Sequence, residues 1–228
     1  FQVNGPYTTS DTVFRSCDIN GNGSVDIIWN TLPGGGDETF AFLDFALGEQ
    51  PYQLKQTTNG IGRTVIYYYG TSIGEMVRDR EQKRSWPHSV PFPVPVIVRF
   101  EVNDGISTYF TEITYHDGYY DAAQREFRGF AAATQRELGD SSLPDLFTDH
   151  IFDTGAEHEV LKGKTLSFEA RTAEKSGEGV FFQERNEWEP RQLLAGATGE
   201  TRTVNFAAQT VRERTVVEEG RGVPVTVR

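Results

Sequence analysis

Apolar and polar side chains alternate most regularly between residues 94 and 103. Valine or phenylalanine occupies every second position from Val94 to Val102, while Arg99 and Glu101 fall between them. A period of two is typical of a β-strand with one solvated face. The pattern therefore predicts a strand here, and it is the clearest element in the chain.

The residues after this strand predict an antiparallel meander. Asn103-Asp104-Gly105 is a turn signal, and a second alternating run extends from Tyr109 to Tyr115. We expect another turn at His116-Asp117-Gly118 and a third strand from Arg125 to Gln135. Gly129 inside that strand indicates a bulge or a close backbone approach.

Other short runs rich in β-branched and aromatic residues predict further strands. They lie at residues 26–29, 40–45, 62–69, 166–170, 180–185, 204–217 and 222–228. Residues 31–37 read as a glycine-rich turn, residues 137–165 as a loop and residues 188–191 as a bend. One helical turn is expected at residues 157–162, closed by Gly163.

The sequence predicts one longer helix, from Ser72 to about Arg84. Ser72 and Glu75 have the spacing of a capping box, in which each side chain bonds the backbone of the other residue. Many charged residues follow, and we expect them on a solvated face. Four prolines then enforce an extended entry into the next strand. They are Pro87, Pro91, Pro93 and Pro95.

These elements predict an all-β chain in three segments. Residues 1–56 resemble the final repeat of a β-propeller, because two short strands flank a glycine-rich turn. Residues 57–90 form a connecting strand, a short helix and a proline-rich segment. Residues 91–228 form an antiparallel β-meander whose outward faces are dense in Glu and Arg.

The composition excludes several classes of partner and location. The 228 residues include 22 basic and 33 acidic ones, a formal charge of −11, and this balance argues against nucleic acid, whose phosphates bind clustered cations. The single cysteine, Cys17, cannot form an internal disulfide. No apolar run approaches the ~20 residues of a membrane helix. No targeting signal is visible, and both ends suggest a piece of a longer polypeptide.

The sharpest local motif is a loop with oxygen-bearing side chains at alternate positions. They are Asp18, Asn20, Asn22, Ser24 and Asp26. Ca²⁺ requires several oxygens at about 2.3–2.6 Å, which a tight loop of this kind can supply. An EF-hand is excluded because Trp29 occupies its twelfth position, where glutamate is needed. The pattern resembles an FG-GAP/VCBS repeat of β-propellers, and a metal-free Asx-rich turn is the alternative.

Several motifs together resemble a known family. They are Trp86-Pro87, Pro91-Phe92-Pro93-Val94, Tyr115-His116-Asp117-Gly118-Tyr119-Tyr120-Asp121, Arg125-Glu126-Phe127-Arg128-Gly129-Phe130, Thr154-Gly155-Ala156 and Leu161-Lys162-Gly163. In kind and order they are similar to the B component of bacterial insecticidal toxin complexes. The N-terminal part of Salmonella virulence-plasmid toxins and of many Rhs-type proteins is similar as well. The resemblance covers about residues 10–190 and departs at Ala131, where the family usually has glycine.

The resemblance implies a structural, non-enzymatic role. In that family an FG-GAP-type propeller gates a hollow shell of spiralling β-strands, and the shell encloses a toxic polypeptide until delivery. The Tyr-Asp and Arg-Gly-Phe motifs look like degenerate YD repeats, which build the shell wall. The implied wall residues are Tyr115, Asp117, Tyr119, Asp121, Arg125, Phe127, Arg128 and Phe130. The implied partners are the remainder of the same chain, the C component and the enclosed toxin, in a secreted or cell-surface protein.

Enzymatic functions have weaker support in the residues. His116 and Asp117 could act as a catalytic pair, but the structural interpretation is favoured. One cluster has metal-ligand residue types: Asp149, His150, Asp153, Glu157 and His158. The eight-residue gap between its histidines lacks zinc-site spacing. A paired-carboxylate site as in a glycosidase could be formed from Glu157, Glu159, Glu184, Glu187 and Glu189, although any acidic β-protein offers such pairs.

A binding module is the alternative function. The tyrosine clusters Tyr67-Tyr68-Tyr69 and Tyr119-Tyr120 could stack on sugar rings. With Ca²⁺ in the Asp18–Asp26 loop, the chain would then be an extracellular adhesion or binding domain that recognises carbohydrate or protein.

Overall fold

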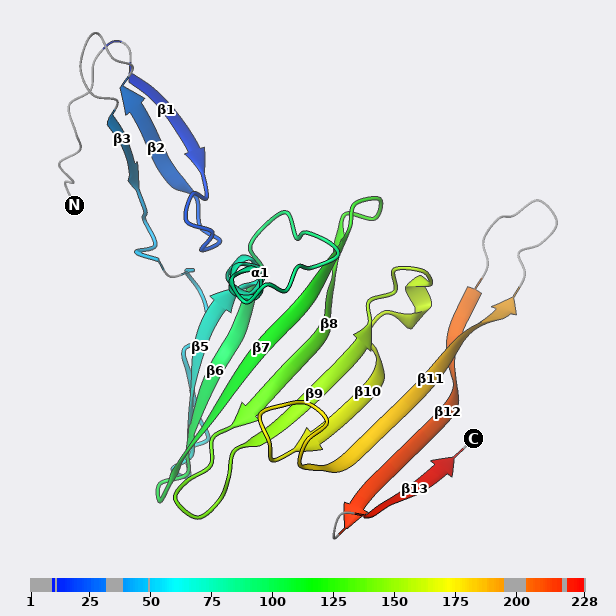
Figure 1. The fold of residues 1–228 in the computed structure, drawn as a ribbon. Coiled ribbons are helices and arrows are strands. Elements are labelled where there is room, and N and C mark those ends of the chain that lie inside the picture. Colours follow the sequence, from blue (N-terminus) through cyan, green and yellow to red (C-terminus); the bar gives the residue numbers. More distant parts are fainter. Residues whose placement is uncertain are drawn as a thin grey trace.

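The computed structural model describes residues 10, 12–31, 39–48, 50–194, 204–218 and 221–227. Within them the chain forms two antiparallel sheets and one α-helix (Figure 1). The smaller sheet has three strands in the order β1-β2-β3 and lies apart at the N-terminal end of the molecule. Its strands are β1 (Thr12–Cys17), β2 (Asp26–Thr31) and β3 (Thr39–Leu43).

The larger sheet has ten strands, and each pairs with the strand next to it in the sequence. They are β4 (Gln56–Thr58), β5 (Thr64–Thr71), β6 (Pro95–Asn103), β7 (Thr108–Asp121), β8 (Glu126–Glu137), β9 (Leu146–Asp153), β10 (Lys164–Arg171), β11 (Val180–Leu194), β12 (Val204–Glu218) and β13 (Arg221–Val227). The helix α1 (Ser72–Glu81) connects β5 to β6, and the 3₁₀ turn η1 (Glu159–Leu161) precedes β10. The all-β, antiparallel prediction is confirmed.

Strand β7 corrects the predicted turn at residues 116–118. The strand continues to Asp121, and Gly118 pairs with Phe130 of β8. Asp117 tolerates a φ of 55° inside the strand, so the turn-like Asp-Gly pair does not end it. The real turn comes after Asp121, whose carboxylate accepts hydrogen bonds from the backbone N–H groups of Ala123 and Gln124.

Strand β8 confirms the bulge predicted at Gly129. The register with β7 shifts here, because Tyr119 pairs with Gly129 and Tyr120 pairs with Phe127. Gly129 has a φ of 100°, a backbone conformation that other residues rarely adopt.

Three further differences concern strand boundaries. Strand β9 lies inside the predicted loop at residues 137–165, whereas the helical turn expected there is present as η1. Strand β11 continues through the predicted bend at 188–191, where the register only shifts between Glu187 and Trp188. Strand β1 was not predicted. The glycine-rich turn at 31–37 lies, apart from Thr31, outside the described residues.

Helix α1 begins one residue earlier than the predicted capping box. Thr71 is the N-cap, and its hydroxyl accepts a hydrogen bond from the Gly74 N–H group at 3.1 Å. Ser72 does not cap the helix, because its fully buried hydroxyl is bonded to the segment before β6. Its hydroxyl donates to the Phe92 carbonyl and accepts from the Val94 N–H group at 2.9 Å, which ties the helix to the entry into β6.

The hydrophobic core is small for a chain of this size. Within the described residues the buried apolar side chains are Val90, Val96, Phe147, Leu161 and Ala170. The accessible surface is 15754 Å², against roughly 10,400 Å² expected for a compact protein of this mass. The larger sheet is therefore an open single layer, and α1 covers only part of one face (Figure 1).

Candidate functional site

The Asp18–Asp26 loop joins β1 to β2 and is closed by its own first carboxylate. Asp18 accepts hydrogen bonds from the backbone N–H groups of Gly21, Asn22 and Gly23 at 2.8, 3.2 and 2.8 Å. Gly21 and Gly23 both have positive φ, which lets the chain wrap around that carboxylate. The Ser24 hydroxyl donates to the Asn22 side-chain carbonyl at 2.6 Å.

Asp26 is the unusual residue of the loop. Its side chain is fully buried, and one oxygen, Oδ2, accepts a hydrogen bond from the Ile19 N–H group at 3.0 Å. The other oxygen, Oδ1, is buried without a hydrogen-bond partner in the part of the chain that the structure describes. A buried carboxylate oxygen without a partner is costly, so this atom is where a cation would be most stabilising.

Asp44 joins this loop from the end of β3, and the sequence did not single it out. Its Oδ2 atom accepts hydrogen bonds from the side-chain amides of Asn20 and Asn22 at 2.9 and 3.2 Å. Desolvation raises the pKa of Asp44, but bonds from the Ala46 and Gly48 N–H groups and these amides outweigh it, and the pKa is lowered. The structure therefore places two of the five predicted ligand residues, Asn20 and Asn22, beside a further carboxylate. Within the described residues, no group of three His, Cys, Asp or Glu residues is arranged to hold a metal.

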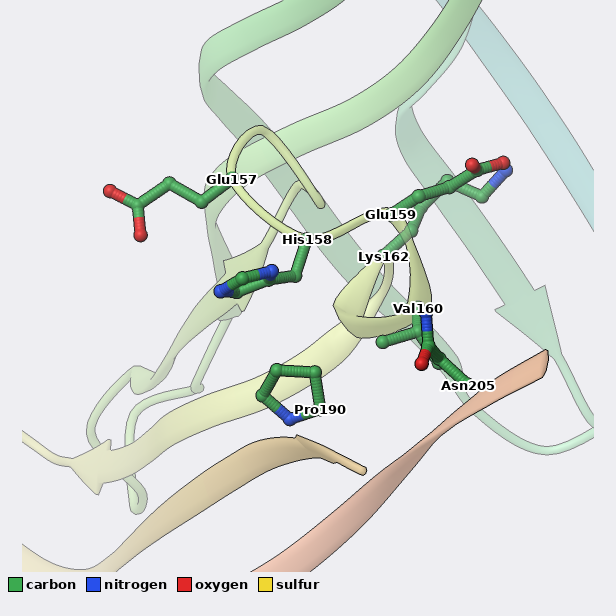
Figure 2. Close-up of a pocket in the computed structure, with 7 residues that line it drawn as sticks. All are labelled: Glu157, His158, Glu159, Val160, Lys162, Pro190 and Asn205. Atoms are coloured by element: carbon green, nitrogen blue, oxygen red, sulfur yellow. The ribbon is translucent and has the colours of Figure 1, made fainter. Parts of the chain in front are cut away.

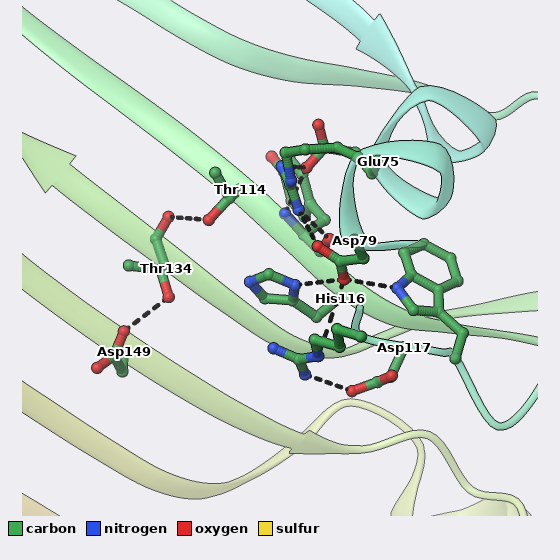
Figure 3. Close-up of polar contacts among 11 residues, drawn as sticks. Glu75, Asp79, Thr114, His116, Asp117, Thr134 and Asp149 are labelled. Atoms are coloured by element: carbon green, nitrogen blue, oxygen red, sulfur yellow. Dashed lines mark hydrogen bonds and ion pairs between the residues drawn. The ribbon is translucent and has the colours of Figure 1, made fainter. Parts of the chain in front are cut away.

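Helix α1 is attached to the larger sheet by a buried carboxylate, that of Asp79 (Figure 3). Asp79 is fully buried and accepts hydrogen bonds from His116 Nδ1 at 2.6 Å, Trp86 Nε1 at 2.7 Å and Arg78 Nη2 at 2.8 Å. Arg84 Nε lies 3.8 Å from the same carboxylate. Burial opposes ionisation, but these donors hold the pKa of Asp79 below its usual value.

A second helix carboxylate completes the attachment. Glu75 accepts a hydrogen bond from the Tyr115 backbone N–H at 2.7 Å and from Arg78 at 2.5 Å, and Arg78 also donates to the Tyr115 carbonyl. The prediction that the charged residues of this helix lie on a solvated face is therefore wrong for Glu75 and Asp79. Both are buried because their partners come from β7, about forty residues further along the chain.

The predicted wall residues lie on the β7–β8 hairpin and its turn. Phe130 packs against Tyr115 and Phe127, with ring centroids 4.8 and 5.3 Å apart. Arg128 is buried, donates to the Gly155 carbonyl at 2.6 Å and pairs with Asp121 at 2.8 Å.

The other wall residues have different surroundings. Asp117 pairs with Arg84, at 2.6 Å, rather than with an arginine of the hairpin. Arg125 lies in the turn with a φ of 56°. Tyr119 packs edge-on against His88 at 5.0 Å.

The face of the sheet that carries α1 is polar. We define this polar face by Glu112, Arg136, Asp149 and Arg171, which the strand register places on one side together with His116 and Thr134. Figure 3 shows His116, Thr134 and Asp149 of this face. Arg136 pairs with Asp145 at 2.6 Å and with Glu112 at 3.4 Å. Arg171 is buried, pairs with Asp149 at 3.0 Å and lies over the Phe147 ring. Ion pairs thus cross neighbouring strands on this face.

The opposite face is aromatic. Opposite partners in the register place Tyr115, Ala133, His150 and Phe168 in one row across β7 to β10. His150 contacts the Phe168 ring at 5.0 Å, and burial in this apolar row lowers the pKa of His150. Phe168 in turn contacts Phe182 of β11 at 5.6 Å. Cross-strand aromatic pairs of this kind stabilise a sheet that has no second layer.

This alternation separates the residues that suggested an enzyme. Asp149 lies on the polar face with Arg171, whereas its neighbour His150 lies in the aromatic row. Successive strand residues point to opposite faces, so the two cannot converge. Glu157, His158 and Glu159 line a surface hollow beside η1, and Figure 2 shows the two carboxylates pointing in opposite directions.

The tyrosine clusters that suggested sugar binding are partly engaged within the chain. The Tyr69 hydroxyl donates to the Leu54 carbonyl, and the Tyr67 hydroxyl lies 3.4 Å from that of Thr57. Tyr120 packs edge-on against Phe92. Tyr68 is 41% exposed and faces the Arg99 guanidinium.

A family comparison identifies the chain. The family model described as "Insecticide toxin TcdB middle/N-terminal region" matches residues 1–158. The chain belongs to this family. The matched region of this TcdB-family chain includes the Asp18–Asp26 loop, helix α1 and the β7–β8 hairpin, and the predicted resemblance to an insecticidal toxin component is confirmed.

Solved structures share the fold of this TcdB-family chain at low sequence identity. A chain of the Photorhabdus luminescens Tc holotoxin pore, with a mutation in TccC3, is 17% identical over 92% of this chain, with a TM-score of 0.76. The crystal structures named TcdB2-TccC3 and TcdB2-TccC3-Cdc42 match with TM-scores of 0.70 and 0.73, each at 17% identity. This chain spans only about an eighth of those chains. No curated protein sequence matches it. Within the described residues, no helix is long and apolar enough to span a membrane.

Proposed function

We propose that the chain forms part of the wall of a shell that encloses a toxic polypeptide, and that it has no catalytic role. The open ten-stranded sheet is the observation that carries this proposal. A wall needs two solvent-accessible faces and stability without a thick core, and this sheet has ion pairs on its polar face and packed rings on its aromatic face. Its fold is that of chains in Tc holotoxin and TcdB2-TccC3 structures.

The proposal includes partners and location. The wall would be completed by the remainder of the same polypeptide and by a C component, with the toxin inside, in a secreted protein. The three-stranded sheet would be the end of an FG-GAP-type propeller, and residues 57–90 would connect it to the wall. These assignments rest on the family and on the separation of the two sheets.

Protease protection tests the wall. In the full-length protein assembled with its C component, the enclosed polypeptide should resist protease until the shell is denatured. The Arg171→Ala variant should lose protection, because it removes a buried guanidinium that joins β9 and β10. Arg185→Ala is the control, since that side chain is 68% exposed on β11. A toxin that is cleaved equally fast in native and denatured wild-type protein would refute the proposal.

We also propose that the Asp18–Asp26 loop binds Ca²⁺. Asp18, Asn20, Asn22, Ser24 and Asp26 would supply oxygens, and the buried Asp26 Oδ1 atom fits a cation because it has no other described partner. Bound Ca²⁺ would supply charge compensation to this loop and no chemistry beyond that. The residues themselves hold the loop closed through the Asp18 hydrogen bonds.

Chelation tests the calcium proposal. Adding EDTA should lower the melting temperature and excess Ca²⁺ should restore it, because a ligand that binds only the folded state stabilises it. The Asp26→Asn variant should melt at the same temperature with and without EDTA. Asp104→Asn, in a turn of the larger sheet, should keep the wild-type response. If EDTA left the melting temperature of the wild-type chain unchanged, the calcium proposal would be wrong.

A further inference from the structure

Helix α1 turns its polar side toward the sheet and apolar side chains away from it. Its buried residues are Ser72, Glu75 and Asp79, which recur at helical spacing along one side. Met76 and Val77 lie off this buried stripe, and Val77 is 41% exposed. A surface helix normally has the opposite arrangement, with its apolar stripe toward the core. On α1 the sheet-facing side is polar, and Val77 is turned away from the sheet.

A hollow lies beside the outward side of the helix. Its volume is about 320 Å³. Its lining residues are Met76, Arg80, Arg84, Ser85, Trp86, Pro87, His88 and Ser89. We call this hollow the Met76 groove. Its apolar lining comes from Met76, Trp86 and Pro87. The Trp86 indole is fixed in place by its hydrogen bond to Asp79 and its edge contact with Phe130, so part of the groove is rigid before any partner binds.

The charge of the groove is opposite to that of the chain. Two arginines and no carboxylate line it, whereas the whole chain carries a formal charge of −11. Arg84 is already paired with Asp117 at 2.6 Å. The Arg80 side chain is exposed and makes no hydrogen bond or ion pair with the residues that the structure describes. One guanidinium at the rim is therefore available for an anionic partner group.

We propose that the Met76 groove binds an acidic, apolar peptide segment of a partner protein. An aliphatic or aromatic side chain would contact Met76 and Trp86, and a neighbouring carboxylate would pair with Arg80. Local charge complementarity selects this partner, because the Arg80 guanidinium at the rim lies next to the apolar side chains of Met76 and Trp86. The inference does not depend on whether the larger sheet forms a shell.

The groove contains a convenient probe, since Met76 is the only methionine of the chain. A chain labelled with [¹³C-methyl]methionine should give one methyl resonance from the groove. We would titrate it with a blocked tetrapeptide that alternates aspartate and leucine, and with matched peptides that carry lysine or asparagine instead of aspartate. The aspartate peptide should shift the Met76 resonance saturably, and the lysine peptide should not.

Two variants test whether Arg80 pairs with a carboxylate of the peptide. Arg80→Gln should weaken binding of the aspartate peptide about threefold, the range of an exposed ion pair. Arg63→Gln, an exposed arginine at the start of β5, should bind as tightly as the wild-type chain. Equal shifts with all three peptides, or unchanged affinity in Arg80→Gln, would overturn the acidic partner. A Met76 shift that follows protein concentration without peptide would assign the groove to a second copy and would also overturn it.

Discussion

Replacing Asp79 with alanine should lower the free energy of unfolding by about 3–5 kcal/mol, the usual cost of removing one partner of a buried ion pair. Asp79 is fully buried and bonds His116, Trp86 and Arg78 at once. The variant leaves these donors without their acceptor beneath α1. Urea denaturation followed by circular dichroism would measure the loss.

Glu81→Ala is the matched control, because Glu81 is an exposed carboxylate on the same helix. It should change stability by less than about 0.5 kcal/mol. The attachment of α1 through Asp79 is contradicted if both variants unfold at the same urea concentration.

The same carboxylate predicts how the helix responds to acid. The pKa of Asp79 is lowered in the folded chain, so its contribution is complete above the unfolded pKa, ~3.9. That contribution is lost only as the pH falls through the lower folded value. The stability penalty of Asp79→Ala should therefore be complete at pH 5 and should shrink below about pH 4.

Replacing Arg128 with methionine should cost about 2–4 kcal/mol, the second largest effect that we expect. The guanidinium is 4% exposed, donates to the Gly155 carbonyl at 2.6 Å and pairs with Asp121 at 2.8 Å. Methionine preserves the apolar stem but leaves the Asp121 carboxylate and the carbonyl without this donor. Thermal denaturation would measure the effect.

Arg125→Met, in the turn of the same hairpin, provides the comparison, since this side chain is exposed. It should stay within about 0.5 kcal/mol of the wild type. If Arg128→Met were equally mild, Arg128 would not join the hairpin to the segment before η1.

Period-two patterns predicted most strands because one face of each strand is more exposed to solvent than the other. The pattern failed at β9, where Asp149 and His150 stand side by side and resemble loop residues. In a single-layer sheet a polar residue can satisfy its bonds on one face, as Asp149 does with Thr134 and Arg171. Without a thick core on either side, the apolar alternation of such a strand is weak.

The site residues that sequence reasoning missed all depend on partners far along the chain. Asp79 meets His116 across 37 positions, and Asp44 meets Asn20 across 24. Local spacing can identify a loop of oxygen-bearing side chains, because its residues lie within one turn of the chain. It cannot show which charged residue of a helix a distant strand will bury.

The strictly sequential pairing of β4 to β13 has a consequence for how the protein is made. Apart from β5 and β6, which are joined through α1, each neighbouring pair of this sheet closes a short stretch of chain. Its entropic cost is therefore small, and it can form as soon as its second strand leaves the ribosome. A sheet in which the first strand needed the last would expose unpaired edges throughout synthesis, which favours aggregation. Here the growing edge is always the strand most recently made, so the sheet can be assembled in the order of translation.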